Sequence, residues 1–254
     1  MLMAKTRPIV SPVKSDLPHN NLLRFLKPPD QALLVRHLEP LRVAAGEILY
    51  EPGDDVDHVH FPEGPALISF MVAFEDGNSV ECALIGREGA VGGIVSQGHL
   101  PAYTRSVVQY PGTLWRMETR QLQAIKEESP ALDQLFTHYA DCLLSQIFQS
   151  VACSAAHSIE QRTARWLLSA HDRTGDLAIP ITQQRLAELL GVGRSYVSRV
   201  LAGLKSDNAL KVSLGCIQIL DRRRLDRHSC NCTRSVRAHF DKVLAQVYPP
   251  DKRS

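Results

Sequence analysis

The spacing of apolar residues between Ile181 and Leu220 predicts two short helices followed by a hairpin. Thr182 is placed to cap the first helix, because its hydroxyl can accept a backbone N–H that a helix start leaves unpaired. Gly191-Val192-Gly193 then interrupts the pattern. Apolar residues recur at three- and four-residue steps, which indicates one packed face on each helix. They are Leu186, Leu189 and Leu190 in the first, and Val197, Val200, Leu201 and Leu204 in the second.

The opposite face of the second helix carries Ser195, Ser198, Arg199 and Ala202 at the same spacing. Small residues permit close approach, and the rigid fork of an arginine matches the O6 and N7 acceptors of guanine in the major groove. Two helices joined by a glycine turn are also common in proteins that bind no DNA, where the charged face is only solvated. The pattern therefore indicates a recognition helix without excluding a structural role.

A hairpin is expected directly after this helix. Ala209–Val212 and Cys216–Leu220 alternate as strands do, around a turn in which Gly215 can supply a positive φ. Arg222-Arg223-Arg224 follows, and Arg222 and Arg223 are expected to contact a DNA backbone. A hairpin in this place is typical of a winged helix-turn-helix and favours the DNA-binding interpretation.

Upstream, the period changes to that of short strands separated by turns such as Pro52-Gly53-Asp54 and Asp76-Gly77-Asn78. This spacing predicts an antiparallel β-barrel or roll. The expected strands are residues 47–51, 56–61, 67–73, 80–85, 104–110 and 113–117.

Helices are expected on both sides of the roll, over residues 22–41, 119–126 and 130–156. The last is far longer than the mean helix of about 11–12 residues. Its apolar stripe is too long for a small roll to cover, which predicts a homodimer joined along this helix. The stripe consists of Leu132, Leu135, Phe136, Tyr139, Leu143, Ile147 and Val151.

A hinge is expected near His157, because Ser158-Ile159-Glu160-Gln161 has the spacing of a capping box and starts a new helix. The last amphipathic segment is expected to pack against the helix-turn-helix core through Val236, Phe240, Val243, Leu244 and Val247. The predicted organisation is a disordered arm (1–21), a roll-shaped sensor domain (22–129), a dimerisation helix (130–157) and a winged helix-turn-helix domain with a C-terminal helix (158–254).

Charge is distributed unevenly along the chain. Residues 180–254 hold 14 Lys/Arg and 6 Asp/Glu, a net charge of +8, whereas residues 1–150 hold 12 and 18, a net charge of −6. A basic module beside an acidic one is expected when only one of them binds a polyanion. The sequence shows no apolar run long enough to span a bilayer and no signal-peptide core, so a cytoplasmic location without membrane contact is expected.

The order of these parts resembles the Crp/Fnr family of bacterial transcription regulators, over roughly Leu22 to Leu220. The resemblance lies in Gly46-Glu47-Ile48-Leu49-Tyr50-Glu51-Pro52-Gly53-Asp54 and in residues 181–201, ITQQRLAELLGVGRSYVSRVL. It implies an α+β protein with a jelly roll like that of cyclic-nucleotide-binding proteins, a long dimerisation helix and a C-terminal winged helix-turn-helix. The implied partners are double-stranded DNA, a second copy of the chain and RNA polymerase.

The resemblance also implies roles for individual residues. Arg199 corresponds to the family's guanine-reading arginine, with Arg194 and Ser198 as flanking contacts. Ser195 stands where a glutamate is often found, so the operator sequence stays open. The full expected DNA-binding set is Thr182, Gln183, Arg194, Ser195, Tyr196, Ser198 and Arg199.

The effector remains open, because the ligand cassette of the cyclic-AMP-binding members is missing. In its place stands Gly86-Arg87-Glu88-Gly89-Ala90-Val91-Gly92-Gly93, which lacks the Gly-Glu-Leu sequence whose glutamate binds the ribose. Cyclic AMP is therefore not expected to bind. Glu88, Arg105 and Ser106 are the candidate pocket residues, although Arg105 could equally be a surface residue with a local partner.

Six cysteines without a dense framework indicate free thiols in a reducing compartment. The oxygen-sensing members hold an iron–sulfur centre on an N-terminal cysteine cluster, and this chain has no cysteine before Cys82. A Cys/His set of zinc type can be written from Cys153, His157, Cys230 and Cys232, but no CxxC pair supports it, so no metal is expected. Thiol redox sensing is the other alternative.

Three classes of function remain. The leading one is a DNA-binding transcription regulator that responds to a signal in the roll; an effector-independent regulator or a redox- or metal-responsive one are its variants. An enzyme is not expected, because no nucleophile–base pair or carboxylate–metal cluster has recognisable spacing, and no catalytic residue is assigned. A protein-interaction scaffold is the third class, against which Arg199 and the basic C-terminal region argue.

Overall fold

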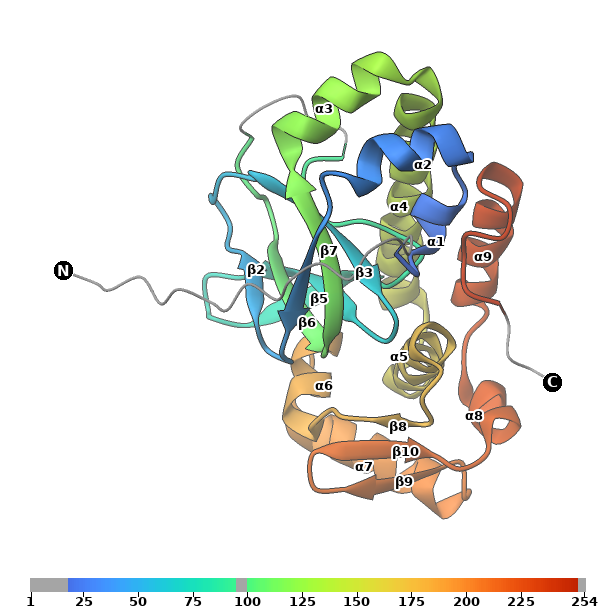
Figure 1. Ribbon diagram of the computed structural model, residues 1–254. Coiled ribbons are helices and arrows are strands. Elements are labelled where there is room, and N and C mark those ends of the chain that lie inside the picture. The colour runs from blue at the N-terminus through green and yellow to red at the C-terminus, as the bar shows by residue number, and fades with distance from the viewer. Residues whose placement is uncertain (1–17, 95–99, 251–254) are drawn as a thin grey trace.

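The computed structural model describes residues 18–94 and 100–250 of the chain. Two antiparallel sheets lie at one end, with strand orders β1-β7-β3 and β2-β6-β4-β5, and the helix-turn-helix lies at the other end (Figure 1). Both sheets are open, so the roll is confirmed and the barrel alternative is wrong. The strands are β1 (Glu39–Val43), β2 (Ile48–Tyr50), β3 (His58–Glu63), β4 (Leu67–Ala73), β5 (Ser79–Ile85), β6 (Arg105–Tyr110) and β7 (Gly112–Glu118).

The helix predicted over residues 22–41 is wrong in part. The structure has two short helices, α1 (Asn21–Arg24) and α2 (Pro28–Val35), and then strand β1. Pro28 occupies the first position of α2, where its missing N–H costs nothing, so it starts a new helix instead of extending the first. β1 pairs with β7 and completes a sheet that the sequence pattern had left with two strands.

The disordered arm predicted over residues 1–21 falls largely outside the described residues, but its end is ordered. Asn20 is fully buried. Its side chain caps α1 by accepting from Leu23 N, and it donates to the carbonyl oxygens of Pro62 and Gly89 at 3.0 and 2.9 Å. These bonds fix the start of α1 on the roll.

After the short helix α3 (Thr119–Glu128), the long helix α4 (Pro130–Ala156) extends beside the roll (Figure 1). Leu132, Leu135, Phe136 and Tyr139 are buried in a core shared with the roll and with the N- and C-terminal helices. The stripe expected to join two subunits is thus covered within one chain over its first half. The exposed apolar positions are Val151, from the predicted stripe, and Leu144 and Phe148, which the prediction had not included.

The chain turns sharply at His157, whose backbone is extended, before α5 (Ile159–Thr174) begins. The capping box is present in full: Ser158 accepts from Gln161 N, and the Gln161 side chain accepts from Ser158 N. The helix boundary predicted from this sequence pattern is confirmed.

Helices α6 (Gln183–Leu190) and α7 (Arg194–Ser206) form the helix-turn-helix, and β9 (Leu210–Ser213) and β10 (Cys216–Ile219) form the wing. Ser213 pairs with Cys216, so Leu214 and Gly215 make a two-residue turn in which Gly215 has a φ of 71°. A third strand, β8 (Ala178–Ile179), pairs with β10 and was not expected from the sequence.

The C-terminal part forms α8 (Arg222–His228) and α9 (Cys232–Val243). The predicted apolar face of α9 exists, but its expected partner was wrong. Val236, Phe240 and Leu244 pack into the core of α4 and the N-terminal helices rather than against the helix-turn-helix, and α9 lies alongside α4 in Figure 1.

The helix-turn-helix packs directly on the roll. Leu67, Met71, Leu84 and Val107 of the β2-β6-β4-β5 sheet belong to the same buried cluster as the apolar faces of α5, α6, α7 and the wing. The two ends of the molecule therefore share a continuous apolar core. No helix within the described residues combines the length and apolar character needed to cross a membrane.

Candidate nucleic-acid interface

Helix α7 has one buried and one exposed face, as its sequence predicts. Val197, Leu201 and Leu204 are at most 1 % exposed, whereas Arg194, Ser195, Tyr196 and Arg199 are exposed. Gly193 caps the start of the helix through its backbone only, and the turn before it is set by Gly191, with a φ of 65°. The side chains proposed for reading DNA thus reach solvent from a rigidly packed helix.

Arg199 and Tyr196 contact one another on this face. The guanidinium carbon of Arg199 lies 5.1 Å from the centre of the Tyr196 ring, a contact that restricts the exposed arginine side chain. Ser198 donates to Oε1 of Gln183, which joins the recognition helix to the start of α6. Thr182 accepts from Arg185 N at 3.0 Å and is the N-cap that its sequence position predicts.

The arginines after the wing differ in exposure. Arg222 donates to Asp172 at 2.8 Å and its side chain is only 14 % exposed, so its predicted contact with a DNA backbone is wrong. Asp172 of α5 holds the Arg222 side chain against the protein. Arg237 of α9 donates to the other oxygen of the same carboxylate at 3.1 Å. Arg223 is exposed, and its backbone contact stays a prediction.

The candidate effector residues are not gathered into one pocket. Glu88 is buried and accepts from Arg173 of α5, Nε to Oε1, at 2.7 Å, with both side chains at most 2 % exposed. Arg105 instead pairs with Glu51 at 2.6 Å, with about two fifths of both side chains exposed. Ser106 is buried in β6. Glu88 thus joins the roll to the helix-turn-helix end of the molecule. Arg105 is a partly exposed residue paired locally with Glu51, which was the alternative considered from the sequence.

Arg173 is the centre of this connection, and no sequence pattern predicted its role. It is fully buried and also donates to Ser169 and, at 3.0 Å, to the hydroxyl of Tyr248. Burial alone would lower the pKa of Arg173, but the adjacent Glu88 carboxylate and Tyr248 outweigh it and raise the pKa. The guanidinium therefore stays charged, and the pair holds α5 on the roll.

A second polar connection lies beside it, in β5. Glu81 accepts from Ser69 and, at 3.0 Å, from Nε1 of Trp166 in α5. Burial raises the pKa of Glu81, although these hydrogen bonds oppose the shift. Glu81 and Glu88 together give the roll two hydrogen-bonded contacts to α5, the helix that precedes the recognition unit.

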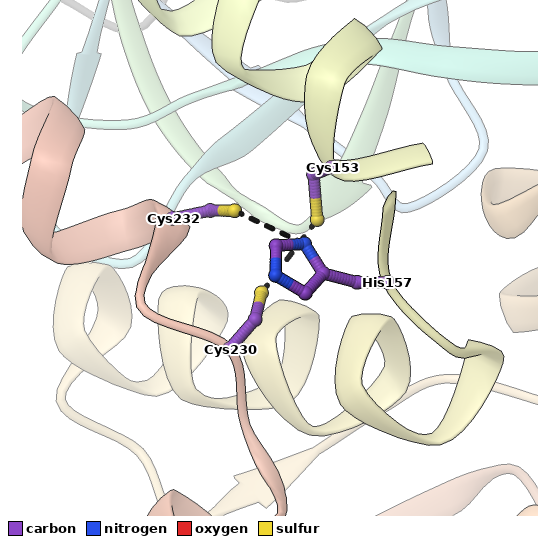
Figure 2. A group of neighbouring side chains, drawn as sticks. All are labelled: Cys153, His157, Cys230 and Cys232. Carbon is purple, nitrogen blue, oxygen red and sulfur yellow. Dashed lines mark hydrogen bonds between the residues drawn. The ribbon is translucent and has the colours of Figure 1, made fainter. Parts of the chain in front are cut away.

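The four cysteine and histidine side chains of the zinc-type set come together, although their sequence spacing did not predict it. Cys153 and His157 lie at the end of α4, Cys230 between α8 and α9, and Cys232 at the start of α9 (Figure 2). Their ligand atoms all lie within 4.8 Å of one another. The hydrogen bond between Cys153 and Cys230 lowers the pKa of Cys230 and raises the pKa of Cys153. Cys230 is therefore deprotonated before Cys153.

Comparison with known proteins bears on the helix-turn-helix domain and on the overall fold. Residues 161–228 match the Crp-like helix-turn-helix domain. No curated protein matches the chain in sequence. FixK2 from Bradyrhizobium japonicum superposes with a TM-score of 0.65 at 15% identity over 76% of this chain and 98% of its own.

Two further solved structures are similar. The c-di-GMP-responsive global regulator CLP from Xanthomonas campestris has a TM-score of 0.63 at 16% identity, over 76% of this chain and 99% of its own. A Crp/Fnr-family transcriptional regulator from Thermus thermophilus, TTHA1359, has a TM-score of 0.59 at 21% identity, over 75% of this chain and 98% of its own. These likenesses span nearly the whole of each relative.

Proposed function

We propose that this chain, which carries a Crp-like helix-turn-helix domain in the fold of the Crp/Fnr transcription regulators, is a homodimeric regulator that reads an inverted-repeat operator. The observation that carries the proposal is helix α7, whose buried face fixes it on the fold while Arg194, Ser195 and Arg199 stand exposed beside a wing. Arg199 reads a guanine, and Arg194 and Ser198 flank it on bases or phosphates. Thr182, Gln183 and Tyr196 position or border these contacts.

The homodimer is supported by the exposed stripe of Leu144, Phe148 and Val151 on α4, which are 45 %, 63 % and 67 % exposed. These positions recur at four- and three-residue steps and would bury one another in a two-fold helix pair. A two-fold dimer presents two recognition helices to one side of the duplex, with half-sites about one helical turn, ~34 Å, apart as in other helix-turn-helix dimers.

Control of DNA binding is assigned to the roll, residues 22–129, acting on the helix-turn-helix domain, residues 158–254, through the helix of residues 130–157. The connections Glu88–Arg173 and Glu81–Trp166 support this, because they join the roll directly to α5. A ligand or signal that moves β5 would thereby shift the helix-turn-helix. RNA polymerase is the expected partner when the regulator is bound at a promoter, and no catalytic role is proposed.

The test is selection of bound sequences from random duplex DNA by the full chain, followed by affinity titration on the selected site. We expect an inverted repeat, and we expect Arg199→Ala to lose the preference for it. Arg120→Ala is the matched control, since Arg120 is an exposed arginine of α3 far from the recognition helix. Enrichment of no sequence, or equal effects of the two variants, would refute the proposal.

A further inference from the structure

Four side chains able to bind a metal converge where α4 ends and α9 begins. Cys153 and Cys230 place their sulfurs 3.6 Å apart, and Cys232 Sγ lies 3.5 Å from Nδ1 of His157. Figure 2 shows the three sulfurs around the imidazole. Within the part of the chain that the structure describes, this is the one group of three or more such residues whose ligand atoms gather this closely.

The spacing fits a single tetrahedral ion. Zinc bonds of about 2.3 Å to sulfur and about 2.0–2.1 Å to nitrogen separate two sulfur ligands by about 3.8 Å and a sulfur from a nitrogen by about 3.5 Å. The Cys153–Cys230 and Cys232–His157 distances match these edges to within a few tenths of an ångström, and all the ligand atoms lie within 4.8 Å of one another. The ligands also come from chain segments more than 70 residues apart, so the fold and not local sequence brings them together.

Packing does not account for these thiols. Buried cysteines usually serve as small apolar residues within a core, as Cys142 does in the core around α4. Cys153, Cys230 and Cys232 instead form a buried cluster composed of the three cysteines alone, apart from the larger apolar cores. No aliphatic residue among those the structure describes belongs to this cluster.

The surroundings suit a negatively charged centre. Three thiolates, one neutral imidazole and Zn²⁺ have a net charge of −1, and Arg162 and Arg165 of α5 lie near enough to interact with Cys153 and Cys230. Gln149 donates Nε2–H to the sulfur of Cys232 at 3.2 Å, the kind of outer hydrogen bond that orients a metal ligand.

We infer that Cys153, His157, Cys230 and Cys232 bind one zinc ion in a closed tetrahedral Cys₃His site. Binding forms four coordinate bonds and releases the protons of the three thiols to solvent, with no change of oxidation state. A closed site without an open position is structural. It ties His157, at the hinge between α4 and α5, to the segment that joins α8 to α9.

Two other occupants of the cluster fit less well. A disulfide between Cys153 and Cys230 would use two of the four convergent groups and leave Cys232 and His157 without a role. An iron–sulfur cluster places its thiolates on different iron atoms, which separates the sulfurs further than a single ion does.

The consequence for DNA binding rests on the proposed function. α4 holds one end of the hinge and α5 leads to α6 and α7, so a zinc ion at the hinge would fix the angle of the recognition helices to the dimerisation helix. Removal of zinc should weaken operator binding, because each recognition helix would then sample several orientations.

The direct test is metal content of the untagged full-length protein grown with added zinc, by elemental analysis, with X-ray absorption to count sulfur and nitrogen ligands. We expect one zinc per chain, with three sulfurs and one nitrogen. His157→Asn and Cys232→Ser should weaken zinc binding at least tenfold in competition with a chromophoric chelator. Gln149→Ala should cost roughly tenfold, as loss of an outer partner does.

Cys82→Ser and Cys216→Ser are the matched controls, since both cysteines are free, partly exposed and outside the cluster. They should retain one zinc per chain. If Cys232→Ser fails to fold, His157→Asn still decides, because His157 is only partly buried and belongs to no apolar core. Zinc that survives both variants, an iron–sulfur spectrum, or a metal-free protein whose mass shows a Cys153–Cys230 disulfide would each overturn the site.

Failure of the two proposals can be told apart. Arg199→Ala should lose operator preference and keep its zinc, whereas His157→Asn should lose zinc and bind the operator more weakly. Zinc binding without any DNA binding would leave the site standing and refute the proposed function. Operator binding by the full chain with no zinc after reconstitution would do the reverse.

Discussion

Two exposed arginines in the DNA-binding half are expected to contact DNA in different ways, one at a base and the other at the phosphate backbone. Arg199 stands on the exposed face of α7 beside Tyr196, and Arg223 lies on α8. We expect Arg199→Ala to cost roughly 1–3 kcal/mol per half-site and to relax the preference at one base position. We expect Arg223→Ala to weaken binding to all sequences alike and to flatten the dependence of affinity on salt.

The measurement is titration of both variants on the selected operator and on single-base variants of it, at two salt concentrations. Arg222→Ala adds a structural comparison. Because Arg222 is paired with Asp172, its loss should lower the thermal stability of the protein more than it changes the salt dependence of DNA affinity. A uniform loss of affinity in Arg199→Ala would make α7 a phosphate clamp and reassign the reading residue.

His60 makes stability depend on pH in the acid range. It is buried in β3 at 5 % exposure, and burial, with His58 and Arg116 nearby, lowers its pKa to about 4. Because the ordinary histidine pKa is about 6.5, the unfolded chain takes up this proton first as pH falls. The contribution of neutral His60 is therefore present in full above about pH 6.5 and is lost progressively down to pH 4.

From these pKa values, wild type should lose roughly 2 kcal/mol through His60 between pH 7 and pH 5, and His60→Gln should lose correspondingly less. Urea unfolding at the two pH values measures the difference. His19→Gln, which removes an exposed histidine, should behave as wild type. An unchanged pH dependence in His60→Gln would show that other groups dominate the acid response.

Among the elements, α4 shows what sequence periodicity can and cannot predict. Its bounds follow from Pro130 and from the capping box at Ser158, both local signals. Which face would be covered could not be predicted, because α9 reaches α4 from nearly a hundred residues further along the chain. The Glu88–Arg173 pair and the cysteine cluster also join residues far apart in the sequence, so no sequence pattern predicted them. The helix-turn-helix and wing depend on contacts within about 40 residues and were predicted from sequence.

The exposed stripe of α4 gives a direct test of the dimer. Phe148→Asp places a charge at the centre of the Leu144–Val151 stripe and should shift the protein from dimer to monomer at micromolar concentration, because a buried unpaired charge costs several kcal/mol. Light scattering measures the mass. Thr137→Asp is the matched control, because Thr137 is exposed on the same side of α4 but lies outside the apolar stripe; it should leave the dimer intact.

A wild-type protein that is monomeric with and without DNA would contradict the dimer. A Phe148→Asp protein that stays dimeric would instead place the contact elsewhere. The first outcome bears on the proposed function, and the second only on the surface used.

The loop Gly86–Gly93 leads us to expect no response to cyclic AMP. It lacks the ribose-binding glutamate motif, and neighbouring helices already pack tightly against it: a Cβ at Gly89 would lie 2.2 Å from the Tyr139 hydroxyl, and one at Gly86 would lie 3.1 Å from Cδ of Arg173. Calorimetry should show no binding at micromolar cyclic AMP. Binding that also tightens the operator complex would contradict this expectation.

At the scale of the whole molecule, the shared core makes the roll and the helix-turn-helix one folding unit. Strand residues such as Leu67 and Leu84 lie in the same buried cluster as Leu186 and Val197, and the ion pair Glu88–Arg173 spans the junction. Breaking a buried pair by removing one partner typically costs about 3–5 kcal/mol. Unfolding of either end would therefore expose apolar residues of the other end to water.

The two tryptophans of the chain report on the two ends separately. Trp115 lies in β7 of the roll, and Trp166 lies in α5, hydrogen-bonded to Glu81. We expect Trp115→Phe and Trp166→Phe each to unfold in urea with coincident midpoints by fluorescence and by far-ultraviolet circular dichroism, because one cooperative transition moves every probe together. Comparing probes within a single variant removes the effect of the substitution itself on stability. In Trp115→Phe, where Trp166 is the remaining tryptophan, a fluorescence midpoint well below the dichroism midpoint would mean that the helix-turn-helix detaches first. The contacts through Glu81 and Glu88 would then be too weak to carry a signal from the roll to the DNA.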